Sequence, residues 1–141
     1  MPKRLRVFVD TSALLAGLNS PNGAAGAILA ACFSKRLIPV ISRQVIEEAE
    51  RNIEMKFPAL HRAWEAFLRI PPELAPDPSL RQIRKVHQIL PTSDAPILAS
   101  ALKAHPDALV TWNTRDFLRK EVMLRTPFPI FIPRDFLKQY L

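Results

Sequence analysis

The sequence is poor in the residues that build cross-linked or zinc-centred proteins. Its one cysteine, Cys32, lies in the apolar stretch 30–33, so it cannot form an intramolecular disulfide and is expected to be a small buried side chain. Its three histidines, His61, His87 and His105, are distant in sequence from the acids described below, so a zinc site of histidine and cysteine has little support. One unpaired thiol fits a reducing compartment, and we expect a cytoplasmic protein.

Long apolar runs and nucleotide-binding loops are also missing. No apolar stretch is long enough to cross a bilayer, and the run that follows the charged segment 1–6 is too short for the core of a signal peptide. The segment 22–26 is too short for a phosphate-binding loop, and no Lys-Ser or Lys-Thr pair follows it. Ser12, Ser42 and Ser93 have no nearby histidine, so a serine nucleophile is unsupported. The sequence therefore argues against membrane association, P-loop chemistry and serine hydrolysis.

What the chain does have is an apolar core composition and an excess of positive charge. Its length of 141 residues suits a single domain covering residues 1–141, and its apolar fraction of 48% is that of a globular protein. Lys and Arg total 20 against 13 Asp and Glu, a formal net charge of +7. Such a balance favours a polyanionic partner, most often nucleic acid; the alternative is a basic surface that serves only solubility.

Segments with the apolar spacing of strands and of helices alternate along the chain. Strands are predicted at residues 5–9, 38–41 and 108–111, with a further edge strand fenced by prolines at 127–133. Three of the predicted helices are placed by their caps: one starts near Ala13 after Ser12, one follows Ser42, and one follows Thr92 or Ser93. The others are predicted at residues 24–33, 60–68, 80–90 and 135–140. This alternation implies an α/β fold with a parallel, doubly wound sheet.

Four acids are placed where strands and helices can bring them together: Asp10, Glu48, Asp94 and Asp116. Asp10 directly follows the first predicted strand, and open α/β sheets bind ligands at the carboxyl ends of their strands. Clustered carboxylates are costly unless a cation neutralises them, and Mg²⁺ or Mn²⁺ prefer oxygen ligands. Such an ion can activate water and stabilise charge on a phosphodiester. The acids and the basic chain together predict a divalent-metal site that acts on a polyanion.

Each of these acids also has an ordinary structural interpretation. Asp10 is a residue type favoured at helix caps, and Asp94 suits the first turn of a helix because of the helix dipole. Asp116 has the position of a cap for a short helix starting at Phe117. Taken singly, most of the acids fit these structural roles, so the functional interpretation rests on their combination.

Glu48 has a close rival in its neighbour Glu47. The predicted buried stripe of that helix comprises Val45, Ile46, Ala49 and Ile53. Glu48 borders this stripe, while Glu47 points further out. We therefore expect Glu48, rather than Glu47, to join the other acids.

Four segments in order resemble the motifs of PIN-domain ribonucleases: residues 7–14, 42–48, 93–101 and 110–117. Residues 23–29 are similar to the toxin-like, VapC-type branch of that family. The resemblance implies a three-layer α/β/α sandwich, an endoribonuclease that depends on Mg²⁺ or Mn²⁺, and an acidic tetrad at the four positions above. It also implies a toxin of a toxin–antitoxin pair, with a small antitoxin as partner and a homodimer or higher homo-oligomer.

The resemblance leaves one metal-facing position and the substrate contacts open. The fourth motif usually offers an acid or Asn two residues after its Thr; here that residue is Asn113, with Asp116 following, so both are candidates. Arg115 is a candidate contact for a substrate phosphate, whereas Trp112 is expected to pack rather than stack on a base. The expected substrate-binding residues are Thr11, Ser12, Thr111, Asn113 and Arg115.

Two other functions compete with RNA cleavage. A non-catalytic RNA-binding or scaffold module with this fold would retain the architecture without the chemistry, but an acid at every tetrad position argues against a decayed site. A phosphatase that forms an aspartyl phosphate on Asp10 generally needs a second acid two residues later. Thr11 and Ser12 follow Asp10, so that acid is missing.

Overall fold

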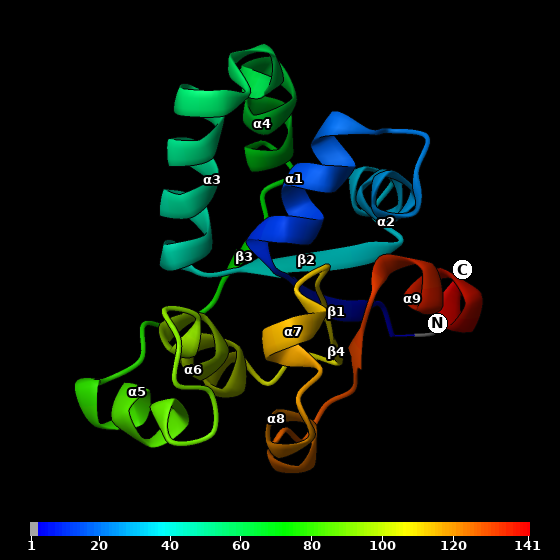
Figure 1. The fold of residues 1–141 in the computed structure, drawn as a ribbon. Coiled ribbons are helices and arrows are strands. Elements are labelled where there is room, and N and C mark those ends of the chain that lie inside the picture. Colours follow the sequence, from blue (N-terminus) through cyan, green and yellow to red (C-terminus); the bar gives the residue numbers. More distant parts are fainter. Residues whose placement is uncertain (1–2) are drawn as a thin grey trace.

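The computed structural model describes residues 3–141 (Figure 1); the first two residues of the charged N-terminal segment lie outside the described residues. Within residues 3–141, five strands form one sheet in the order β3-β2-β1-β4-β5, and every neighbouring pair is parallel. The strands are β1 (Leu5–Val9), β2 (Leu37–Ile41), β3 (Glu73–Leu74), β4 (Ala108–Val110) and β5 (Ile130–Phe131). The predicted parallel sheet is confirmed.

Helices cover both faces of this sheet. They are α1 (Thr11–Asn19), α2 (Ala24–Phe33), α3 (Arg43–Lys56), the 3₁₀ turn η1 (Pro58–Leu60), α4 (His61–Leu68), α5 (Leu80–His87), α6 (Ala95–Ala104), α7 (Thr114–Phe117), α8 (Lys120–Arg125) and α9 (Pro133–Tyr140). Figure 1 shows α1–α4 on one side of the sheet and α5–α8 on the other, with α9 packed beside α2. The layers are those of the expected α/β/α sandwich.

The central strand β1 creates the point at which the chain changes direction across the sheet. β1 lies between β2 and β4, and its residues Val7, Phe8 and Val9 are almost completely buried. The chain proceeds from β1 to β2 on one side, while β4 and β5 extend the sheet on the other. Parallel sheets leave a crevice at the carboxyl ends of the two strands on either side of such a switch. Asp10 and Thr111 directly follow these two strands, β1 and β4.

Helix α3 forms as its sequence predicts. Ser42 caps it, because its Oγ accepts a hydrogen bond from the backbone N–H of Val45 at 3.2 Å. Val45, Ala49 and Ile53 are buried along one stripe. The helix ends at Lys56, just before the Phe57-Pro58 pair that was expected to break it.

At three helix starts the N-cap residue differs from the one that the sequence suggested. Helix α1 begins at Thr11 with Asp10 at its N-cap, while the Ser12 hydroxyl contacts the Asp10 carboxylate instead. Asp94, not Thr92 or Ser93, occupies the N-cap position of α6.

The third corrected cap lies after β4. Helix α7 begins at Thr114, where Asn113 Oδ1 accepts a hydrogen bond from the backbone N–H of Asp116 at 3.3 Å. Asp116 therefore lies inside the helix rather than capping one that starts at Phe117. The cap belongs to Asn113, whose short amide side chain suits that position.

Three short elements were not predicted: η1, β3 and α8. Strand β3 has two residues, and α8 buries only Val122, so neither carries a periodic apolar pattern. Over the described part of the chain, no helix combines the length and apolar character needed to span a bilayer.

Candidate metal centre

Asp10 is the most buried acid at the switch point, with an exposed fraction of 4%. Its Oδ2 accepts hydrogen bonds from Thr111 Oγ1 at 2.8 Å and from Ser12 Oγ at 3.1 Å. Burial raises the pKa of Asp10 above its ordinary value, although hydrogen bonds from Thr111, the Thr11 backbone and Ser12 lower it, and the charge of Glu48 raises it further. Two hydroxyls from separate elements thus orient one carboxylate.

Asp94 and Asp116 are joined by one amide. Asn113 Nδ2 donates to Asp94 Oδ2 at 2.8 Å and to Asp116 Oδ2 at 3.1 Å. The pKa of Asp94 is raised to about 7. Burial is the largest cause, and the charge of Asp10, a hydrogen bond with Asp116 and the charges of Glu48 and Asp116 contribute in that order. The four acids chosen from the sequence therefore lie close enough to affect one another.

The two open alternatives have different outcomes. Glu48 is half-buried and its negative charge acts on both Asp10 and Asp94, whereas Glu47 is exposed. The structure thus brings Glu48, not Glu47, to the cluster. Asn113 and Asp116 are not exclusive alternatives, because the Asn113 amide lies between Asp94 and Asp116 and contacts both.

The predicted substrate contacts divide into inner and outer residues. Thr111 and Ser12 contact Asp10 directly, and their hydroxyls also lie 3.2 Å apart. Thr11 is buried, and its Oγ1 has no hydrogen-bond partner among residues 3–141. Arg115 is exposed on α7, next to Asp116 in sequence. The expectation that Trp112 packs into the protein is wrong: its exposed fraction is 42%.

The donor chemistry of this cluster fits a hard divalent cation. Its oxygen donors are carboxylates, and no histidine contributes to it, which suits Mg²⁺ or Mn²⁺ better than zinc. As they stand, no three His, Cys, Asp or Glu side chains within the described chain converge as a ready-made ligand group. Mg²⁺ commonly keeps several waters and uses only one or two carboxylates. The raised pKa of Asp94 reflects burial first and the negative charge of the neighbouring acids second, and such a cation would compensate that charge.

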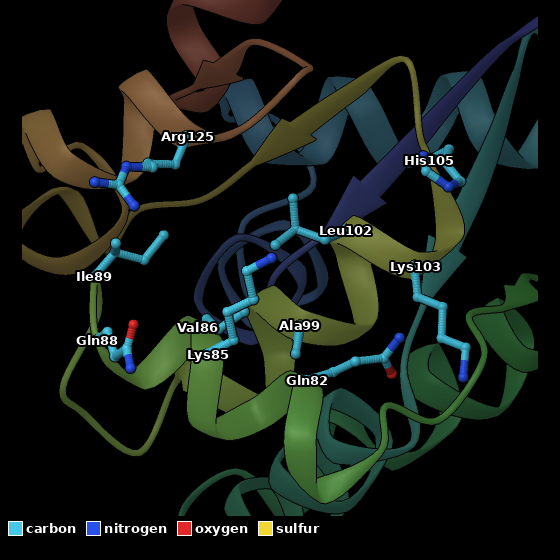
Figure 2. Close-up of a pocket in the computed structure, with 10 residues that line it drawn as sticks. All are labelled: Gln82, Lys85, Val86, Gln88, Ile89, Ala99, Leu102, Lys103, His105 and Arg125. Carbon is cyan, nitrogen blue, oxygen red and sulfur yellow. The ribbon is translucent and has the colours of Figure 1, made fainter.

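A separate groove of about 580 Å³ lies between α5 and α6, and none of the four acids lines it. Figure 2 shows its lining, which mixes basic side chains with apolar ones such as Val86 and Leu102. The basic lining residues are Lys85, Lys103, His105 and Arg125. No carboxylate lines this groove and its charged side chains are basic, so the candidate centre is the acidic cluster and not the groove.

Solved structures share the fold. The chain resembles PAE2754 from Pyrobaculum aerophilum with a TM-score of 0.61 and 18% identity over 95% of this chain and 88% of that one. It also resembles a chain in the structure of VapBC2 from Rickettsia felis, bound to a DNA fragment from their promoter, with a TM-score of 0.60 and 19% identity over 90% of this chain and 97% of that one. At these identities the likeness concerns the fold.

Comparison of sequences supplies the family. No curated protein sequence matches the chain. The family model described as PIN domain matches residues 6–115, a segment that includes Asp10, Glu48, Asp94 and Asn113 and ends one residue before Asp116. This match covers most of the chain, and it agrees with the resemblance seen in the four sequence motifs. The chain belongs to the PIN-domain family.

Proposed function

We propose that this protein is a divalent-metal-dependent endoribonuclease that hydrolyses RNA phosphodiester bonds. One observation carries the proposal: acids from four separate elements gather at the switch point of the sheet, where burial and mutual charge raise the pKa of Asp94 to about 7. Proteins of the PIN-domain family are generally nucleases, and the net charge of +7 suits a polyanionic substrate.

Asp10 and Asp94 are the proposed principal ligands of Mg²⁺ or Mn²⁺, with Asp116 and Glu48 completing the acidic set. When bound, the ion would activate water and stabilise the charge that develops on the phosphodiester. Thr111 and Ser12 hold the Asp10 carboxylate in one orientation through the hydrogen bonds at 2.8 and 3.1 Å. Asn113 holds the carboxylates of Asp94 and Asp116 in place, because its amide donates to both.

The remaining polar residues have proposed roles in substrate handling. Glu48 is half-buried beside Asp10 and Asp94, which suits either a ligand or an acceptor for the proton of the attacking water. Arg115 is exposed one residue before Asp116, so its guanidinium is the proposed contact for a substrate phosphate. Thr11, which directly follows Asp10, is also proposed as a substrate contact; its buried hydroxyl has no hydrogen-bond partner among residues 3–141.

Cleavage of a labelled single-stranded RNA in the presence of Mn²⁺ tests the proposal. Asp10→Asn and Asp94→Asn are each expected to lower kcat by at least about 100-fold, because each removes a charge from the metal site. Glu47→Gln is the matched control, since Glu47 is exposed and outside the cluster, and it should retain activity. Unchanged cleavage in both aspartate variants would contradict the proposal.

The biological role that we propose is that of the toxin in a toxin–antitoxin pair in the cytoplasm. Its support is the motif resemblance together with the shared fold of a chain from VapBC2. The proposed partner is a small antitoxin, and the proposed assembly is a homodimer or higher homo-oligomer. Growth arrest on expression, relieved by a short neighbouring gene product, would support this role; RNA cleavage without growth arrest would argue against it.

The competing function is a non-catalytic RNA-binding or scaffold module. It is favoured by the observation that no three acidic or other metal-ligating side chains of residues 3–141 converge as they stand. Calorimetric titration with Mg²⁺ and Mn²⁺ separates the two functions. Saturable binding that Asp94→Asn abolishes would support the nuclease, whereas the absence of binding would favour the module.

A further inference from the structure

Trp112 lies at the rim of the acidic cluster and is exposed. Its backbone N–H donates to Ser12 Oγ at 3.0 Å, and its backbone carbonyl accepts from the N–H of Thr114 at 3.0 Å. Ser12 Oγ in turn contacts Asp10. The backbone of Trp112 is therefore held on both sides, two hydrogen bonds away from the Asp10 carboxylate, while its side chain keeps an exposed fraction of 42%.

The other tryptophan shows what a structural role looks like in this protein. Trp64 is 2% exposed, its ring stacks on that of Phe67 with centroids 6.0 Å apart, and its Nε1 donates to Glu50 at 3.3 Å. A single exposed apolar side chain needs no explanation by itself. Trp112 differs because its chain neighbours Thr111 and Asn113 both contact acids of the cluster. The core accounts for Trp64 and does not account for Trp112.

We propose that Trp112 forms a stacking subsite for an unpaired nucleobase of the RNA, next to the phosphodiester that is cleaved. This inference rests on the proposed ribonuclease function and adds to it a residue that selects among RNA conformations. A nucleobase presents its face to an aromatic ring only when it is unpaired and splayed from its neighbours, as in single strands and loops. The subsite would therefore select single-stranded or looped RNA over duplex.

Arg115 supports this assignment by its position. It is exposed three residues after Trp112, so a cation for a phosphate and an aromatic face for a base lie on the same short segment. Proteins that bind single strands combine these two features, positive charge along the backbone and aromatic rings under the bases. Stacking is tolerant of sequence, since every base has an aromatic face. The subsite thus predicts strand selectivity rather than a strict base preference.

Tryptophan fluorescence tests the contact without relying on cleavage. In an Asp10→Asn background, a short single-stranded RNA is expected to quench the emission of Trp112. Trp112→Phe leaves buried Trp64 as the sole tryptophan, so quenching should disappear, although the anisotropy of labelled RNA should show that it still binds.

Trp112→Leu should weaken RNA binding by about 5- to 100-fold, because the aromatic face is lost. Phe57→Leu is the matched control, since Phe57 is 39% exposed but follows the far end of α3.

A substrate series locates the subsite. RNAs that carry one abasic nucleotide at successive positions are cleaved by the wild-type protein and by Trp112→Leu. We expect one position next to the cleaved bond at which loss of the base lowers kcat/KM about 5- to 100-fold in the wild type and has little further effect in Trp112→Leu. An equal response of both proteins at every position would overturn the subsite.

The outcomes separate this inference from the function on which it rests. If the wild-type protein neither binds nor cleaves RNA with Mn²⁺, the ribonuclease proposal fails and the subsite fails with it. If it cleaves RNA but Trp112→Leu matches it in binding and strand selectivity, only the subsite fails. A shift of Trp112 emission with protein concentration alone would assign the residue to an interface between proteins and would likewise overturn the subsite.

Discussion

At the scale of single residues, the candidate centre is a set of carboxylates held by neutral donors. Thr111 and Ser12 donate to Asp10, and Asn113 donates to both Asp94 and Asp116. Neutral donors stabilise carboxylates without supplying the charge that a cation would supply. Burial is the main cause of the raised pKa of Asp94, and the charges of the other three acids add to it, so the metal-free cluster retains electrostatic repulsion.

Asp94→Asn is expected to stabilise the metal-free protein. An ordinary aspartate ionises near pH 4, so between about pH 4 and about pH 7 folded Asp94 keeps a proton that the unfolded chain releases. The free energy of unfolding then falls as the pH rises through this window. Asparagine resembles the protonated acid and can still donate to Asp116. Because Asp94 is only partly buried, we expect Tm at pH 7.5 to rise by about 2–6 °C in thermal unfolding without metal.

The same variant should respond differently to metal. Mn²⁺ is expected to raise the Tm of the wild-type protein, because a ligand that binds only the folded state stabilises it. Asp94→Asn should lose that response, and its Tm should depend less on pH between about pH 4 and about pH 7. A lower Tm for Asp94→Asn without metal, or an undiminished Mn²⁺ effect, would show that Asp94 is not the repelled carboxylate of a metal site.

At the scale of elements, Arg6 explains how the short edge strand β3 is attached. The guanidinium of Arg6, on β1, pairs with Glu73 of β3, with Nε 2.9 Å from Oε1. It also donates to the carbonyls of His105 at 2.8 Å and Ala104 at 3.0 Å, at the end of α6. Since β1 and β3 are separated by β2 in the sheet, one long side chain joins elements that do not pair directly.

Arg6→Met is expected to destabilise the fold without affecting the metal centre. Methionine retains the apolar stem but loses the hydrogen bonds to Glu73 and to the two carbonyls. Hydrogen bonds to charged groups contribute about 1.5–3 kcal/mol each, and partial exposure reduces that value, so a net loss of about 1–3 kcal/mol is expected in urea unfolding. The affinity for Mn²⁺ should stay the same, because Arg6 lies near the N-terminal end of β1, away from the carboxyl ends of the strands where the acids lie. A large loss of affinity would mean that β3 positions the site.

At the scale of the whole molecule, the formal charge of +7 surrounds a locally acidic centre. A positive net charge suits attraction of a polyanion, and a cluster of acids suits binding of a metal cation where the polyanion reacts. Arg115 beside Asp116 illustrates this juxtaposition in a single helical turn. We expect RNA affinity to be sensitive to salt, because Lys and Arg side chains that contact phosphates displace the cations condensed on the nucleic acid.

RNA binding by Asp10→Asn should weaken steeply as salt rises. For a single strand that engages about three to five cations, the plot of log K against log salt concentration should have a slope of about −2 to −4. Arg115→Gln is expected to make the slope shallower by about 0.7, whereas Trp112→Leu should lower affinity with little change of slope, because stacking releases no counterions. Anisotropy of a labelled RNA at several salt concentrations measures both. A slope near zero would show that the positive charge does not contact the RNA.

Local patterns predicted the elements that are long or strongly periodic. Strand β1, helix α2 and helix α3 were recognised because their apolar spacing matches one period over the whole element. Strand β3 was not predicted because its two residues are too few to show a period, and helix α8 was not predicted because only one of its side chains is buried. These short elements exist because of contacts made by other parts of the chain, such as the pairing of Arg6 with Glu73.

The sequence by itself determined the family and the parallel α/β layers, because the alternation of strands and helices and the helical period translate directly into buried stripes and strand ends. The same period favoured Glu48 over Glu47, since Glu48 borders the buried stripe of α3. The tertiary structure decided between Asp10 and Ser12 at the start of α1, and it alone decided the bridging place of Asn113 between two acids and the exposure of Trp112. These features depend on contacts between side chains of β1, β4, α6 and α7 and of the residues next to them. Local sequence cannot specify such contacts, because the partners are up to 101 residues apart.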